Sequence, residues 1–113
     1  MKTNKYSKII IDNCNILTSL SANDIFQMHL IYDQYHQMLI NIIDNVGNAL
    51  VALGDIENKL YIDTIYSYAM MLPTFLDYKS GYQDESDALQ YIDKFLHDNR
   101  YYFTNLINKY EQK

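Results

Sequence analysis

Hydrophobic residues recur every three or four positions along most of the chain, which is the period of an amphipathic α-helix. Gly54 and Asp55 interrupt the pattern as a helix C-terminal glycine and a capping aspartate, so we expect a tight turn between two antiparallel helices there. Pro73 ends or kinks the segment before it. The expected helices cover residues 4–20, 24–53, 56–72 and 84–110. The hydrophobic face of the first comprises Tyr6, Ile9, Ile10, Asn13, Cys14, Ile16, Leu17 and Leu20. That of the second comprises Ile25, Met28, Ile31, Tyr32, Tyr35, Met38, Leu39, Ile42, Ile43, Val46, Ala49, Leu50 and Leu53.

The last of these segments has the most regular hydrophobic face. Its residues alternate in steps of four and three, which is typical of antiparallel bundles and coiled coils. They are Ala88, Ile92, Phe95, Asn99, Tyr102, Leu106 and Tyr110. Three glycines and one proline in 113 residues are too few for a sheet fold with many hairpins. The sequence therefore predicts an all-α fold, an antiparallel four-helix bundle of three long helices and an N-terminal helix, in one domain spanning residues 1–113.

Segment 56–72 differs from the others because it has two hydrophobic faces. One face is formed by Ile56, Leu60, Met71 and Phe75, flanked by Tyr61, Tyr68 and Leu72, and the other by Ile62, Tyr66, Ala69 and Met70. A helix at the edge of a bundle buries one face against the core. We expect the first face to lie in the core and the second to contact a partner protein or a second copy, unless the core encloses both faces.

Tyrosine is unusually frequent, with twelve residues and no tryptophan. Several tyrosines fall outside the expected core faces. They are Tyr66, Tyr78, Tyr82, Tyr91 and Tyr101. Rigid amphipathic rings of this kind are enriched at protein interfaces, so we predict that they contribute to a partner-binding surface.

The chain is acidic, with fourteen Asp and Glu against nine Lys and Arg and a net charge of −5. This charge disfavours direct binding to nucleic acid. Asp84, Glu85 and Asp87 begin the last segment, where carboxylates stabilise a helix N-terminus. The same residues could also join the partner-binding surface, acting in part as a mimic of nucleic acid.

A metal site is a weaker alternative. His29, Asp33 and His36 follow the spacing i, i+4, i+7 and can line one side of a helix, where imidazole and carboxylate groups suit zinc or iron. Asp93 and His97 are a second pair that could complete such a site. The triplet is expected at the edge of the hydrophobic face, pointing toward water. We therefore expect it to make local hydrogen bonds, and we expect no metal or other cofactor.

The sequence also gives little sign of catalysis. Its one cysteine, Cys14, falls on a hydrophobic face, and the chain has no glycine-rich phosphate loop, HExxH or GxSxG motif. The apolar run near the N-terminus stops at Asp12, too soon for a signal peptide or a membrane span. We expect a cytoplasmic protein that is not an enzyme.

The leading hypothesis is a non-enzymatic interaction protein, an acidic helical bundle that binds another protein and inhibits or regulates it. Its size and acidity suit a mobile-element inhibitor or an immunity-type protein, which is an analogy of class only. A metal-binding or small-ligand-binding bundle and a structural homodimer are the alternatives.

Overall fold

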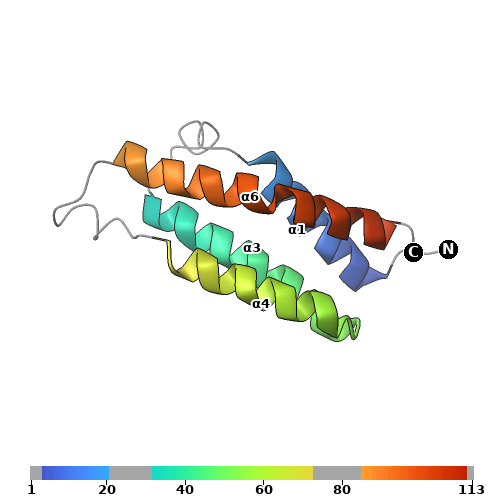
Figure 1. Cartoon of the computed structure of the whole chain (residues 1–113). Helices are drawn as coiled ribbons and strands as arrows, with labels where there is room; N and C mark the ends of the chain where they lie inside the picture. The colour runs from blue at the N-terminus through green and yellow to red at the C-terminus, as the bar shows by residue number, and fades with distance from the viewer. Residues whose placement is uncertain (1–3, 21–31, 73–84, 112–113) are drawn as a thin grey trace.

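The computed structural model describes residues 4–20, 32–72 and 85–111, and these residues form an all-α helical bundle (Figure 1). Its helices are α1 (Lys5–Ser19), α3 (Tyr32–Ala52), α4 (Ile56–Met70) and α6 (Glu85–Glu111). No strand occurs in these three stretches of the chain. The predicted fold class is confirmed.

The predicted helix boundaries agree with the structure to within two residues wherever they can be compared. Asn4 caps α1, since its side chain accepts a hydrogen bond from the Tyr6 N–H at 2.7 Å. Asp55 caps α4 by accepting from the Asn58 N–H at 3.4 Å. The break expected between residues 20 and 24, the expected helical residues 24–31, and Pro73 lie outside the described residues.

α3 and α6 run in one direction along the bundle, and α1 and α4 run in the opposite direction (Figure 1). α1 packs against both α3 and α6, and α3 packs against both α1 and α4. The backbones of α4 and α6 approach each other less closely than these pairs do. Side chains therefore determine where the interface between α4 and α6 is closed and where it stays open.

The core lies along the predicted hydrophobic faces of α1, α3 and α6. Its largest fully buried side chains are Phe103, Ile10, Leu17, Leu39, Ile43, Leu50, Ile62 and Ile92. The seven-residue rhythm of α6 is realised as predicted, with Ile92, Leu106 and Tyr110 almost completely buried. Burial of these apolar surfaces is the main stabilising contribution to the bundle.

α4 faces the core with the opposite side from the one predicted. Ile62 and Ala69 are 2% and 0% exposed, whereas Leu60 and Met71 are 64% and 76% exposed. Two contacts with α3 explain this choice. Ile62 packs against Gly47, its Cγ2 lying 3.4 Å from the position of a Cβ there. The Ala69 carbonyl oxygen lies 2.7 Å from Nε2 of the buried His36 on α3.

Two glycine substitutions are expected to change stability in opposite directions. Gly47→Ala should raise the free energy of unfolding by about 0.5–1 kcal/mol, because glycine is unfavourable inside a helix and the new methyl group meets Ile62 at ordinary contact distance. Gly54→Ala should lower it by about 1 kcal/mol, because Gly54 has a φ of 73°. Urea denaturation followed by circular dichroism measures both. Changes of the same sign would contradict this account of α3 and its turn.

Candidate functional site

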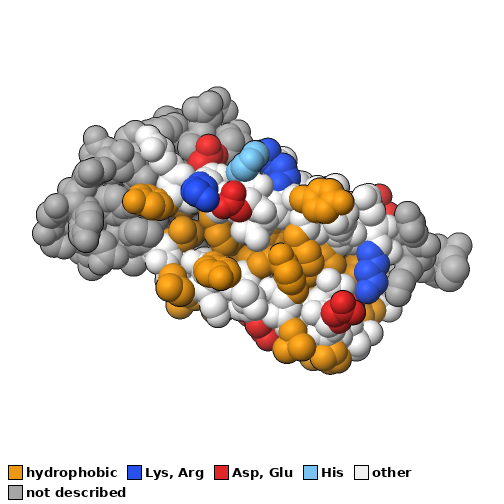
Figure 2. Space-filling model, in the orientation of Figure 1, with side chains coloured by type: hydrophobic (Ala, Val, Ile, Leu, Met, Phe, Trp, Pro, Cys, Tyr) orange, Lys and Arg blue, Asp and Glu red, His pale blue; other side chains and the backbone are white. Residues whose placement is uncertain are grey.

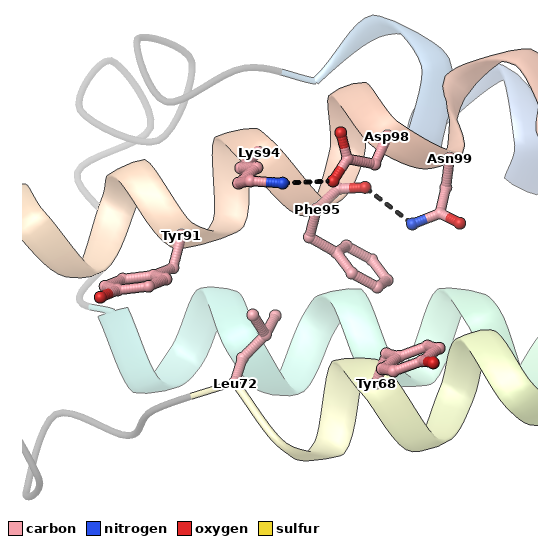
Figure 3. Close-up of a pocket in the computed structure, with 7 residues that line it drawn as sticks. All are labelled: Tyr68, Leu72, Tyr91, Lys94, Phe95, Asp98 and Asn99. Atoms are coloured by element: carbon pink, nitrogen blue, oxygen red, sulfur yellow. Dashed lines mark hydrogen bonds and ion pairs between the residues drawn. The ribbon is translucent and has the colours of Figure 1, made fainter.

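A groove of about 350 Å³ opens between α6 and the C-terminal end of α4 (Figure 3). It is lined by Tyr68, Leu72, Tyr91, Lys94, Phe95, Asp98 and Asn99. In Figure 3 the Leu72 side chain points toward α6 and the Phe95 ring points toward α4, so these two form an apolar floor. Tyr68 and Tyr91 flank it and are 60% and 54% exposed. Figure 2 shows the same side of the molecule, with hydrophobic side chains gathered along α4 and between α4 and α6.

Polar groups lie along the α6 side of the groove. Lys94 Nζ forms an ion pair with Asp98 Oδ2 at 2.8 Å, and Asn99 Nδ2 donates a hydrogen bond to the Phe95 carbonyl oxygen at 2.8 Å. Both members of the ion pair are more than half exposed, and such pairs contribute little to stability. Lys94 and Asp98 can therefore give up their ion pair and each bind a charged group of a partner instead, at a small cost in free energy. An apolar floor with a polar edge is the usual anatomy of a protein-binding pocket.

The other end of the interface between α4 and α6 is closed by polar side chains around Asp55. The Asp55 carboxylate accepts hydrogen bonds from Lys109 Nζ at 2.7 Å, from the Tyr110 hydroxyl and from Asn58 Nδ2 at 2.9 Å. Tyr102 extends this group, since its hydroxyl donates to Asn58 Oδ1 at 2.9 Å. We call these five residues the Asp55 network. It ties the C-terminal half of α6 to the start of α4.

Aromatic stacking reinforces the closed end. The rings of Tyr61 on α4 and Tyr102 on α6 lie 4.2 Å apart between centroids with an interplanar angle of 26°. Stacked aromatic pairs add about 0.5–1.5 kcal/mol beyond the area that they bury. α4 and α6 are thus held together from Asp55 to Tyr61, and the groove lies between them beyond Tyr61.

The pKa shifts in the Asp55 network indicate a structural role. Burial of the Asp55 carboxylate opposes ionisation, but the hydrogen bonds from Lys109, Tyr110 and Asn58 outweigh it and hold the pKa below its usual range. Burial and the neighbouring Asp55 charge raise the pKa values of the Tyr102 and Tyr110 hydroxyls. A general acid or base works best with a pKa near the ambient pH. These groups are shifted away from neutrality and suit a permanent clamp between α4 and α6.

His36 was predicted to lie at the edge of the hydrophobic face and to point toward water, and this prediction is wrong. His36 is 8% exposed, and its Nε2 lies 2.7 Å from the carbonyl oxygen of Ala69 near the end of α4. Because a carbonyl only accepts hydrogen bonds, this nitrogen carries a proton and donates. The imidazole adds to the backbone hydrogen bond that the same carbonyl accepts from the Leu72 N–H at 3.2 Å, and so helps to satisfy the C-terminal end of α4.

This placement removes His36 Nε2 from metal binding. His29 and the side chain of Asp33 lie outside the described residues, and Asp93 and His97 are exposed on α6. Within the described ranges, no group of three or more His, Cys, Asp or Glu side chains lies close enough together to hold a metal ion.

Cys14 is fully buried among core side chains of α1. Burial raises the pKa of its thiol to about 12, so the reactive thiolate is scarcely formed at neutral pH. The residue fills space in the core and does not offer a nucleophile.

The predicted partner-binding residues are distributed unevenly. Ile62 and Ala69 lie in the core and are unavailable to a partner, which corrects the expectation for that face of α4. Tyr66 is partly buried, while Met70, Tyr91 and Tyr101 are 53%, 54% and 79% exposed. Only Tyr91 among them lines the groove. Tyr78, Tyr82 and Asp84 lie outside the described residues, and so do the side chains of Glu85 and Asp87.

Sequence reasoning missed most of the groove. Tyr68 and Leu72 were recognisable as flanking residues of a hydrophobic face, and Phe95 as a core residue. Their positions in the sequence carry no sign that α4 and α6 separate between them. That separation depends on where the Asp55 network and the Tyr61–Tyr102 stack end.

Comparison of the chain with models of known protein families, with curated proteins and with solved structures finds no match. A search of the described helices for a segment long and apolar enough to cross a membrane finds none. The function is therefore inferred from the geometry of this chain.

Proposed function

We propose that this protein is a non-catalytic interaction module that binds another protein through the groove between α4 and α6, and inhibits or regulates it. The observation that carries the proposal is the apolar groove of about 350 Å³ with exposed Tyr68 and Tyr91 beside it. A pocket of this size accepts one or two large apolar side chains. Tyrosine rings at its edges add contact area with few torsions to immobilise.

Charge suggests the character of the partner. The chain has a net charge of −5, and Asp98 lies at the groove with Lys94. An acidic protein attracts basic surfaces over several ångströms and associates with them faster. The partner we infer presents an apolar side chain for the groove and carries a basic surface that the acidic chain attracts.

The test begins with capture of the partner from the native host, using the full chain as bait, and its identification by mass spectrometry. Affinity for the identified partner is then measured by isothermal titration calorimetry. Tyr68→Ala and Tyr91→Ala are each expected to weaken binding at least about tenfold, because each removes an aromatic contact beside the apolar anchor.

Ile16→Ala is the matched control. Ile16 is 42% exposed on α1, which does not line the groove, so affinity should be unchanged. Circular dichroism confirms that each variant is folded. Folded Tyr68 and Tyr91 variants that bind as tightly as the wild-type chain would place the interface elsewhere and refute the proposal.

A further inference from the structure

The side of α4 that points away from the bundle is apolar. Five exposed residues at spacings of four, four, three and four line it, and we call them the outer face of α4: Ile56, Leu60, Thr64, Ser67 and Met71. Ile56, Leu60 and Met71 are 60%, 64% and 76% exposed. Exposed hydrophobic side chains aligned on one side of a helix mark a candidate interaction surface. The space-filling view shows hydrophobic side chains along α4 (Figure 2).

The order of residues along the outer face is self-complementary. Large side chains stand toward both ends, and the small Thr64 and Ser67 lie between them. When a second α4 runs antiparallel about a twofold axis between residues 63 and 64, Leu60 faces Ser67 of the other copy. In the same register Ile56 faces Met71 of the other copy. Leu60 of each copy thus meets the small Ser67 of the other, and this contact occurs twice, as contacts do in an isologous interface.

The charge of α4 permits two copies to meet. Its charged residues are Glu57, Lys59 and Asp63, and Lys59 and Asp63 form an ion pair with each other. No charged residue occurs from Thr64 to Leu72. In the proposed register this uncharged half of one copy lies opposite residues 56–63 of the other, and Asp63, beside the axis, is paired with Lys59 of its own copy.

The area of the face is sufficient for a weak dimer. Together with the adjacent Met70, which is 53% exposed, the exposed apolar side chains of two copies offer on the order of 1,000 Å². Specific protein interfaces begin at about this area, and small ones bind weakly. We propose that two copies of this chain pair through the outer faces of α4, antiparallel and with the twofold axis near Thr64, at micromolar concentration.

The pairing has a consequence for the groove. The proposed twofold axis lies in the interface and is perpendicular to both α4 helices. Rotation about it keeps the α6-facing side of α4 pointing in the same direction in both copies. Tyr61, which stacks on Tyr102 of α6, marks that side. The two grooves of the dimer then open toward the same side, where a partner with two copies of its own binding segment can occupy both.

Sedimentation equilibrium tests the dimer. From about 5 to about 500 μM the wild-type chain should show a reversible monomer–dimer equilibrium in the micromolar range expected for so small an interface. Leu60→Glu should be monomeric throughout, because it buries a carboxylate against Ser67 of the other copy. Ile16→Glu is the control: Ile16 is 42% exposed on α1, and its variant should dimerise like the wild type.

Two results would overturn the proposal. One is a wild-type chain that stays monomeric over the whole range, which would assign the outer face to a different protein. The other is equal dissociation in the Leu60→Glu and Ile16→Glu variants, with both folded by circular dichroism.

Disulfide cross-linking tests the register. Thr64→Cys should form a covalent dimer on mild oxidation, because the two residues 64 lie beside the axis. Ile56→Cys should not, because the two residues 56 are separated by roughly 22 Å at 1.5 Å per residue. Cys14 is buried and does not compete, and the wild-type chain serves as the blank. Cross-linking of Ile56→Cys as fast as Thr64→Cys would refute the antiparallel register.

Discussion

Replacing Asp55 with alanine should lower the free energy of unfolding by about 2–4 kcal/mol, as measured by urea denaturation. The substitution removes the N-cap of α4 and the acceptor for Lys109 and Tyr110 of α6. The Asp55 side chain is 10% exposed, so water replaces these contacts poorly. A loss of this size is a large share of the 5–15 kcal/mol by which small domains are stable.

The Asp55 contribution should also depend on pH. Because its folded-state pKa is lowered, the stabilisation is complete above the unfolded pKa of about 4 and is lost as the pH falls below it. Asp55→Asn keeps a good N-cap but cannot ionise. The wild type should exceed this variant in stability at pH 7 and lose the advantage by about 1.4 kcal/mol per pH unit below about pH 4.

Urea denaturation of both chains from pH 7 to pH 3 measures this difference and cancels the titration of all other groups. A stability difference between the two chains that stays constant over that range would contradict the hydrogen bonding described for the Asp55 carboxylate.

Phe103→Ala is expected to lower the free energy of unfolding by about 3–5 kcal/mol. Phe103 is fully buried where α6 meets the core, and its ring contacts Tyr102 edge to face at 5.8 Å. The truncation loses buried apolar area and leaves a cavity that neighbouring side chains fill only in part. Urea denaturation at pH 7 gives the change directly.

Tyr101→Ala provides the matched control for Phe103→Ala. Tyr101 precedes Phe103 by two residues on the same helix and is 79% exposed, so its truncation should alter stability by less than about 0.5 kcal/mol. Similar losses in the two variants would mean that α6 is rotated relative to the arrangement described above.

The periodicity of α3 and α6 was sufficient to place their core residues. Leu39, Ile43 and Leu50 recur on one side of α3, and that side is the one buried. Such a helix has a single apolar face, so hydrophobic burial leaves no alternative orientation. The cap at Asp55 was equally legible, because it depends on side chains only a few residues away.

The orientation of α4 was predicted wrongly for a physical reason. Both of its sides are apolar, so burying either one gives a similar hydrophobic gain. The choice was settled by α3, where Ile62 packs against Gly47 and His36 donates to the Ala69 carbonyl. These contacts join residues distant in sequence, and the local pattern of α4 contains no trace of them.

The sequence by itself therefore determined that this chain forms amphipathic antiparallel helices, where they begin and end within the described residues, and which described residues of α1, α3 and α6 form the core. These features depend on helical period, caps and turns, which are local. Only the tertiary structure decided which side of α4 is exposed, that His36 is buried, and that the interface between α4 and α6 closes at Asp55 and opens at Tyr68. Those outcomes follow from shape and hydrogen bonding between distant segments, which hydrophobic periodicity does not encode.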